Sequence, residues 1–416
     1  MPAAACIESE IGRLRRVVIH TPGGEIESMS PRAASEVLYH DIIPLSVVSA
    51  EHAVLKQFLS LVARVDEATD LLTAALADTD QRELLVRAIC REAPAARRVL
   101  ELRDQRPEQL AAMLVTGLGS RRESLCDLLY GPEHDVPPLA NLYFMRDSSF
   151  VVRDRVVIGA MAHRVRTGEA LLVRAIFGAS AVANGGMLYD GCEEAGLQAD
   201  VRIEGGDVLV LRRDLLAVGV SERTSAAAID VLARRFVAAY GEPLSFVVVL
   251  LPHDRSTIHL DMIFTHVDPH TALVYEPLVT GPRRLEVYRM RVAPGAATRF
   301  EKCDGLIPAL IAEGLELRTI ACGGPDPVVR EREQWLSAAN VFAFAPGKVL
   351  GYDCNAATME AFSQAGYAVH PAGDFIDGSR SVDEYERLFV GMPGVNLARG
   401  GGGPRCMTLP VARDPA

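Results

Sequence analysis

Apolar and polar positions alternate in short blocks along most of the chain, and the blocks repeat. Apolar runs at 149–152 and 156–160 flank a charged turn at 153–155, a pattern that predicts a β-hairpin. The same pattern predicts three more hairpins, at 207–220, 262–275 and 341–352. An apolar run at 13–20, ended by Thr-Pro-Gly-Gly at 21–24, predicts a further strand.

Helical spacing of apolar residues appears between these strands. It predicts helices at 167–177, 226–240 and 356–365. Thr167 and Asn355 are the expected N-caps of two of them, and Gly366 ends the last. Apolar runs at 245–251 and 367–370 predict strands after two of the helices. The order of strand, turn, strand, helix and strand predicts a pseudo-symmetric α/β repeat whose units point one end at a common site.

The pattern changes between 50 and 129. Leu, Ala, Glu and Arg dominate there, and helical spacing replaces the strand pattern, most clearly at 50–65 and 79–92. We therefore expect an inserted α-helical domain at 50–129, and an α/β domain formed by 1–49 and 130–416.

Composition limits the classes of partner. The 416 residues are 49% hydrophobic and 23% charged, which is typical of a large globular protein. The net charge of -11 argues against a nucleic-acid partner and is compatible with a small cationic substrate. No uncharged apolar run is long enough to span a bilayer, and residues 1–8 lack the pattern of a secretory signal, so we expect no membrane partner.

The cysteines are scattered and include no Cys-x-x-Cys pair. They are Cys6, Cys90, Cys126, Cys192, Cys303, Cys322, Cys354 and Cys406. This pattern favours a reducing cytoplasm over a disulfide framework or a structural zinc site.

The densest chemical signal is the run 399–410. Four glycines and Pro404 precede Cys406, so a substrate or another backbone can come close to the sulfur. Arg405 is expected to favour the thiolate, which is the reactive form. On this segment alone, a flexible tail with a buried cysteine is an equal alternative.

Polar motifs stand just before three of the predicted hairpins. They are Asn141-Leu-Tyr-Phe-Met-Arg-Asp147, Glu204-Gly-Gly-Asp207 and His259-Leu-Asp261. On an extended strand, the side chains of His259 and Asp261 would lie on the same face. Burying two polar side chains beside an apolar run costs free energy, so we expect them to have a function there. Taken singly, His259 is better explained as a core histidine, and Glu204 or Asp147 as a turn carboxylate. Together with Cys406, they indicate a site.

This set of residues limits the reaction. A cysteine with a histidine supplies a nucleophile and a general acid or base. Several carboxylates would suit an acyl-transfer oxyanion poorly, but they pair well with a planar guanidinium. Thiol attack on a guanidinium carbon uses all of these residues. Phosphate-loop, serine-hydrolase and zinc-protease motifs are absent from the sequence.

The chain resembles the arginine deiminase family of guanidino-group-modifying enzymes. The resemblance is carried, in family order, by His20-Thr-Pro-Gly23, Asn141-Leu-Tyr-Phe-Met-Arg-Asp147, Arg166-Thr-Gly-Glu169, Glu204-Gly-Gly-Asp207, Glu222-Arg-Thr224, His259-Leu-Asp261 and Gly402-Gly-Pro-Arg-Cys-Met-Thr408. It implies a five-bladed pseudo-symmetric α/β propeller of ββαβ units with an inserted helical bundle. It also implies a homo-oligomer, either a dimer or a tetramer.

The resemblance also implies a mechanism. Cys406 would be the nucleophile and His259 the proton shuttle, while Asp147 and Asp261 would grip the guanidinium and Glu204 would assist. L-arginine would become L-citrulline and ammonia through a covalent S-alkylthiouronium. The family needs no metal and no organic cofactor.

The resemblance assigns a second set of residues to substrate binding. Asn141, Arg166 and Arg223 would hold the α-carboxylate of the substrate, and Phe144 and Arg399 would complete the substrate contacts.

The sequence departs from the family pattern at several positions. Gly401 stands where the family often has an arginine that moves on binding, so gating of the thiol is expected to differ. Met145 and Ser148 replace other residues around Asp147, and Tyr39-His40-Asp41 stands where an acidic pair is usual. These changes leave substrate scope open.

Three alternatives therefore remain at the level of sequence. An arginine amidinotransferase shares the same Cys–His–acid residues. A deiminase of a modified arginine, or of another guanidino compound, is also compatible with the sequence. A non-catalytic arginine-binding protein is disfavoured, since it would be expected to have lost Cys406 or His259.

Overall fold

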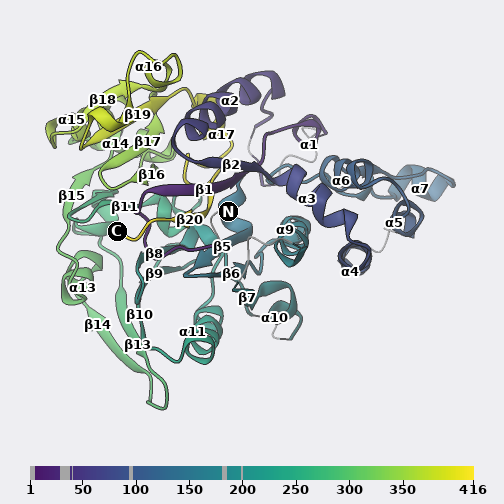
Figure 1. Cartoon of the computed structure of the whole chain (residues 1–416), viewed down its shortest axis with the longest axis horizontal. Helices are drawn as coiled ribbons and strands as arrows, with labels where there is room; N and C mark the ends of the chain where they lie inside the picture. Colours follow the sequence, from purple (N-terminus) through teal and green to yellow (C-terminus); the bar gives the residue numbers. More distant parts are fainter. Residues whose placement is uncertain (1–4, 29–37, 40, 93–96, 180–184, 198–199) are drawn as a thin grey trace.

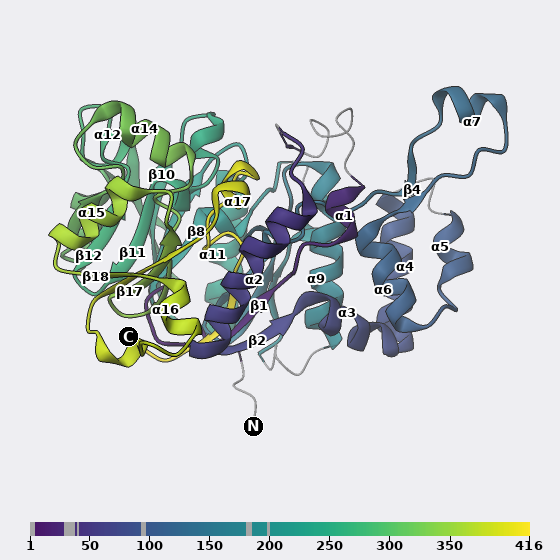
Figure 2. The same cartoon turned by 90° about the horizontal axis from the view of Figure 1, so that it is seen from above.

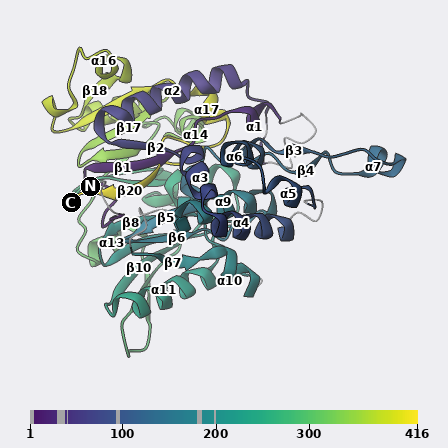
Figure 3. The ribbon, with the colours of Figure 1, turned by 45° about the vertical axis from the view of Figure 1, so that its right-hand side comes forward.

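Five small sheets carry most of the strands in this computed structural model, which describes residues 5–28, 38–39, 41–92, 97–179, 185–197 and 200–416 (Figure 1). One sheet joins the two ends of the chain, with β1 (Leu14–Ile19) between β2 (Arg64–Glu67) and β20 (Leu409–Arg413). β1 and β20 lie side by side in antiparallel register (Figure 3). This pairing brings Cys406, just before β20, close to the N-terminal segment.

The other four sheets follow in chain order. They contain β5 (Ser149–Val152), β6 (Arg155–Ile158) and β7 (Met187–Asp190); β8 (Val208–Arg212), β9 (Leu215–Val220), β10 (Leu244–Leu250), β13 (Val287–Val292) and β14 (Arg299–Cys303); β11 (Phe264–Asp268), β12 (Thr271–Val274) and β15 (Arg318–Ala321); and β16 (Phe342–Ala345), β17 (Lys348–Tyr352), β18 (Ala368–Pro371) and β19 (Leu388–Met392). A short ladder pairs β3 (Leu118–Gly119) with β4 (His134–Val136).

All five sheets share one pairing rule. A central strand, which is β1, β6, β9, β12 or β17, pairs antiparallel with one neighbour and parallel with the other. The parallel partner follows after a helix, because a parallel pair needs a crossover connection. The four predicted hairpins and the repeat of strand, turn, strand, helix and strand are therefore confirmed.

Helices connect and flank the sheets. They are α1 (Gly24–Glu27), α2 (Leu45–Val62), α3 (Ala68–Ala77), α4 (Thr79–Glu92), α5 (Arg97–Leu102), α6 (Pro107–Thr116), α7 (Leu125–Tyr130), α8 (Met145–Ser148), α9 (Thr167–Ala179), α10 (Gly191–Leu197), α11 (Ala226–Tyr240), α12 (Glu276–Val279), α13 (Leu306–Ala312), α14 (Pro327–Trp335), α15 (Ala356–Gln364), α16 (Ala372–Ile376) and α17 (Val395–Arg399). Short 3-10 turns are η1 (Arg164–Arg166), η2 (Gly205–Asp207), η3 (Arg255–Thr257), η4 (Leu260–Met262) and η5 (Val382–Glu384).

The predicted helices are present, but neither expected N-cap is formed. Thr167 is already the first residue of α9, with helical φ -57 and ψ -36. α11 has the predicted bounds, with the Ser225 hydroxyl accepting from the Ala228 N–H. Asn355 precedes α15 without capping it, because its side-chain amide instead donates to Leu336 O at 3.2 Å.

The stretch 50–129 is not purely helical, so that part of the expectation is wrong. β2 lies within it and pairs parallel with β1, where the buried Asp66 pairs with Arg16. The prediction missed β2 because its sequence, Arg-Val-Asp-Glu, contains no apolar run. α3 to α7 form a separate group beside α9, with α7 furthest from the sheets (Figure 2).

One helix among the described residues, α2, is long and apolar enough to cross a membrane by length and composition alone. It is not an uncharged run, because it contains Glu51 and Lys56. It packs against α16 and α17, and Phe58 is buried there between the rings of Phe344 and Phe375.

Candidate active site

A cavity of about 650 Å³ opens between the loops that precede the sheets. Eight of the ten predicted site residues line it: Asn141, Phe144, Asp147, Arg166, Arg223, His259, Arg399 and Cys406. The other two, Glu204 and Asp261, are fully buried behind this lining and contact it. The structure therefore brings the whole predicted set together.

The repeat explains this convergence. Asp147, Glu204, His259 and Cys406 each stand a few residues before the first strand of a hairpin or before β20. Since the five sheets share one topology, equivalent ends of different sheets supply the site. This agrees with the expectation that each unit points one end at a common site.

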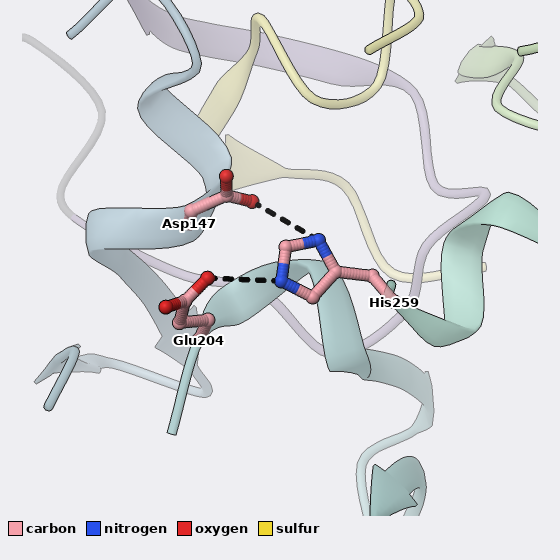
Figure 4. A group of neighbouring side chains, drawn as sticks. All are labelled: Asp147, Glu204 and His259. Atoms are coloured by element: carbon pink, nitrogen blue, oxygen red, sulfur yellow. Dashed lines mark hydrogen bonds and ion pairs between the residues drawn. The ribbon is translucent and has the colours of Figure 1, made fainter. Parts of the chain in front are cut away.

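His259 is held between two carboxylates (Figure 4). Its Nε2 lies 3.0 Å from Glu204 Oε2, and its Nδ1 lies 3.6 Å from Asp147 Oδ1. Burial lowers the pKa of His259, but the charge of Asp147 and the hydrogen bond to Glu204 outweigh burial and raise that pKa to about 9. His259 is therefore protonated at neutral pH in the free site.

Two arginines of the cavity lining bind these acids. Arg166 Nη1 donates to Asp147 Oδ2 at 2.7 Å, and its Nε and Nη2 donate to Glu169. Arg223 Nη1 lies 3.5 Å from Glu204 Oε2. Burial would raise the pKa of Glu204, but Arg223, His259 and Arg166 hold it below its ordinary value. Arg166 and Arg223 thus fix the acids that surround His259.

The thiol lies on the other side of the cavity. Cys406 Sγ is 3.9 Å from Asp261 Oδ2, and the Cys406 N–H donates to Asn340 Oδ1 at 3.0 Å. Burial raises the pKa of Cys406 well above its ordinary value, and the charges of Asp261 and Asp147 raise it further. The free site therefore holds a neutral thiol at neutral pH.

Arg405 favours the thiolate of Cys406 as expected, because its charge lowers the pKa of the thiol, but burial and the charges of Asp261 and Asp147 outweigh it in the free site. Arg405 is buried and donates to both oxygens of Glu10, at 3.1 Å each, and to Asp261 Oδ2 at 2.6 Å. Its charge is matched by these two carboxylates, so little of it acts on the sulfur.

The expected geometry of His259 and Asp261 is also wrong. They do not share one face of a strand, because His259 precedes the 3-10 turn η4 and Asp261 lies within it. The turn separates the two side chains, so that His259 contacts Glu204 while Asp261 contacts Arg405 and the thiol.

The remaining predicted residues, Asn141, Phe144 and Arg399, also line the cavity. Phe144 packs against the glycine loop, where a Cβ at Gly402 would lie 2.4 Å from its ring. Gly401 adopts φ +99, which favours glycine. Arg399 is exposed and pairs with Asp41, while His40 lies outside the described residues.

Sequence reasoning missed four residues around the site. Glu169 holds Arg166, Glu10 holds Arg405, Arg255 lines the cavity, and Asn340 binds Cys406. Asn340 could have been found, because it stands just before β16 at the point equivalent to the other motifs. Glu169 lies in the matched motif that starts at Arg166.

Asp147, Glu204 and His259 could also be considered as metal ligands. Each offers one ligand atom, and the three atoms lie within 4.8 Å of one another. However, Arg166 and Arg223 already hold the two carboxylates, and His259 is protonated at neutral pH. This set fits proton transfer and cation binding better than a metal ion.

Comparisons with known proteins show the family of the chain. The arginine deiminase family model matches residues 35–413. An arginine deiminase of Mycobacterium tuberculosis (strain ATCC 25618 / H37Rv) is 32% identical over 425 residues, which are 98% of each chain. An arginine deiminase of Clostridium perfringens (strain SM101 / Type A) is 30% identical over 436 residues, again covering 98% of each chain.

Solved structures support the fold. AgrE, solved in a ternary complex with ornithine and NAD+, is 15% identical with a TM-score of 0.53; the match covers 96% of this chain and only 40% of AgrE. SxtG, an amidinotransferase from Microseira wollei in the saxitoxin biosynthetic pathway, is 12% identical with a TM-score of 0.53 and coverage of 99% and 98%. The fold is the mixed α/β fold of guanidino-modifying enzymes, and the chain belongs to the arginine deiminase family.

Proposed function

We propose that this chain hydrolyses L-arginine to L-citrulline and ammonia through a covalent intermediate on Cys406. One observation carries the proposal. Asp147 and Asp261 each keep one buried carboxylate oxygen, Oδ1, without a hydrogen-bond partner among the described residues. Asp147 Oδ1 has only its 3.6 Å ion pair with His259 Nδ1. A buried carboxylate oxygen without a hydrogen bond is costly, and a guanidinium bound beside Sγ would supply one to each aspartate.

The arriving cation would also activate the thiol. Its positive charge near Sγ offsets the carboxylates that hold the pKa of Cys406 high. The thiol then releases its proton to solvent, since His259 is already protonated, Sγ bonds to the guanidinium carbon, and a C–N bond breaks. His259, protonated beforehand, gives its proton to the departing nitrogen, which leaves as ammonia.

The second half of the reaction uses water. Neutral His259 takes a proton from a water molecule, and the oxygen attacks the S-alkylthiouronium carbon. The C–S bond breaks, citrulline leaves, and the sulfur recovers its proton. Glu204, 3.0 Å from His259, stabilises the imidazolium in each half.

The α-carboxylate of the substrate is proposed to lie toward Asn141, Arg166 and Arg223. Arg223 is the best suited, because its Nε is buried without a hydrogen-bond partner among the described residues. All three nitrogens of Arg166 already donate to acids, so Arg166 contributes less. Phe144 would pack on the aliphatic stem, and Arg399 would close the mouth.

We extend the proposal to the whole molecule. The five sheets are proposed to form the blades of a closed propeller, supported by their common topology. The helical group within 50–129 is proposed as an inserted domain, supported by its packing on α9. A cytoplasmic protein that binds no nucleic acid or membrane is proposed, supported by cysteines that are scattered without a Cys-x-x-Cys pair and by the net charge. The homo-oligomer that the family resemblance implies is proposed on that resemblance alone.

One experiment tests the activity. Purified protein is incubated with arginine, with and without glycine or lysine, and products are identified by mass spectrometry. Citrulline and ammonia, formed equally with and without a chelator, are expected. Transfer of the amidino group to the added amine would instead establish an amidinotransferase. A parallel reaction with N-methylated arginine tests the alternative of a modified substrate.

A further inference from the structure

The buried pair Glu10–Arg405 lies directly beneath the thiol and has no part in the mechanism above. Glu10 comes from the segment before β1, and Arg405 comes from the segment before β20. The antiparallel pairing of β1 and β20 brings them together across 395 residues of sequence. Arg405 forms a two-pronged bond with Glu10, which holds its guanidinium in one orientation.

In this orientation, the remaining nitrogen of the guanidinium, Nη1, points to Asp261. Arg405 Nη1 donates to Asp261 Oδ2 at 2.6 Å, and its Nη2 also donates to Val208 O at 2.9 Å. Asp261 Oδ2 is therefore occupied, while Asp261 Oδ1 stays buried without a partner among the described residues. Arg405 thus selects which oxygen of Asp261 remains for the substrate.

The pair stays charged across the pH range in which enzymes work. Burial would raise the pKa of Glu10, but Arg405 and Arg146 lower it to about 2. Burial lowers the pKa of Arg405, but Glu10 and Asp261 outweigh burial and raise it above its ordinary value. The bond between them is therefore a permanent support rather than a titrating switch.

We propose that Glu10 and Arg405 are positioning residues that aim Asp261 Oδ1 at the substrate guanidinium beside Cys406. This proposal rests on the proposed hydrolysis of arginine. Arg405 acts through the geometry of its fork and not through its charge on the sulfur, since Glu10 and Asp261 already match that charge. The N-terminal segment thereby becomes part of the active site.

The variant Arg405→Lys separates the geometric role of the guanidinium from the effect of its positive charge. Arg405→Lys keeps the positive charge but cannot hold Glu10 and Asp261 at the same time. The kcat for arginine is expected to fall about 100-fold, because a misplaced binding group costs that much. The matched control is Arg413→Lys. Arg413 is also buried, but among the described residues its hydrogen bonds go to the backbone oxygens of Gly12 and Ala343, so kcat should stay close to that of the wild type.

A second pair of variants keeps the test decisive if Arg405→Lys folds poorly. Glu10→Gln should lower kcat in the wild-type background but have little further effect in an Asp261→Asn background, because both changes act through one carboxylate. Rates are measured well below the unfolding temperature of each variant, and turnover by the wild-type protein establishes the proposed function separately.

The outcomes divide clearly. A selective loss in Arg405→Lys, or non-additive losses for Glu10 and Asp261, supports the proposal. Normal turnover by Arg405→Lys, equal losses in Arg405→Lys and Arg413→Lys, or additive losses in the double variant would overturn it.

Discussion

The two sides of the cavity are built from similar parts but have opposite proton chemistry. The histidine side holds His259 with Asp147 and Glu204, and the thiol side holds Cys406 with Asp261. Both sides are buried, and on both an arginine binds a neighbouring carboxylate. Burial alone would therefore favour the neutral form of both the His259 imidazole and the Cys406 thiol.

The neighbours decide the difference. Around His259, two carboxylates overcome burial and raise the pKa to about 9. Around Cys406, the carboxylates add to burial, since a thiolate is itself an anion, and the pKa rises well above its ordinary value. Acids that charge the histidine therefore keep the thiol neutral.

This contrast prepares each side for its step. In the proposed mechanism, the proton that the leaving nitrogen needs is already on His259, and the reactive thiolate of Cys406 forms only when the cationic substrate binds. A site with a permanent thiolate would be open to oxidation and alkylation. The predictions below test the two sides against each other.

The largest effect is expected on the thiol side. Cys406→Ser should lower kcat for arginine at least about 1,000-fold, because a hydroxyl is a much weaker nucleophile. Arginine binding, measured by calorimetry, should remain, since the acids are untouched. The control is Cys322→Ser, another buried cysteine whose pKa is raised by burial to about 12. Its kcat should stay normal, and loss of turnover in this variant instead would contradict the assignment.

On the histidine side, Glu204→Gln should lower kcat about 100-fold or more, the usual size of a general acid contribution. It removes a carboxylate that raises the pKa of His259, so that pKa should fall. The alkaline limb of the kcat profile should therefore move to lower pH. Glu169→Gln, which loses a partner of Arg166 but no contact with His259, should leave that limb in place. An unmoved limb in Glu204→Gln would refute the role of the glutamate.

Arg223→Lys tests the carboxylate end of the substrate. The KM for arginine should rise about 10- to 100-fold, the usual cost of losing hydrogen bonds between charged groups. Agmatine, which lacks the α-carboxylate, should be a poor substrate for both the wild type and Arg223→Lys. Its KM should be the same for the two proteins. Arg399→Lys, at an exposed ion pair, should have a smaller effect. Equal use of agmatine and arginine by the wild type would show that no group reads the carboxylate.

The last prediction concerns stability rather than turnover. The pKa of His259 is about 9 in the folded protein and about 6.5 in an unfolded chain. Its contribution is therefore fully present below pH 6.5 and is lost as pH rises through 9, with a slope of at most about 1.4 kcal/mol per pH unit. Denaturant unfolding of the wild type and His259→Gln should show a difference that shrinks between pH 6.5 and 9. A constant difference would mean that the imidazole is neutral.

Sequence reasoning succeeded where the local pattern carries the information. Charged turns between apolar runs located the hairpins, and polar motifs before them located most of the site. It failed at edge strands such as β2 and β14, whose exposed or polar residues give no apolar run.

Other features could not be predicted because they depend on contacts between distant segments. Glu10 meets Arg405 only through the pairing of β1 with β20. For the same reason, the sequence overstates how far Arg405 lowers the pKa of Cys406. Arg405 adjoins Cys406 in sequence, but in the folded chain the carboxylate of Asp261 lies beside the thiol and binds Arg405. Charges adjacent in sequence are a weak guide to pKa values in a buried site.

The most direct test of the account is to find the covalent intermediate. The working enzyme is quenched with acid during turnover of arginine, digested, and mapped by peptide mass. We expect an added mass equal to arginine less ammonia on the peptide that contains Cys406, and on no other cysteine peptide. An adduct on Cys322 or Cys354, or active turnover without any adduct on Cys406, would contradict the mechanism.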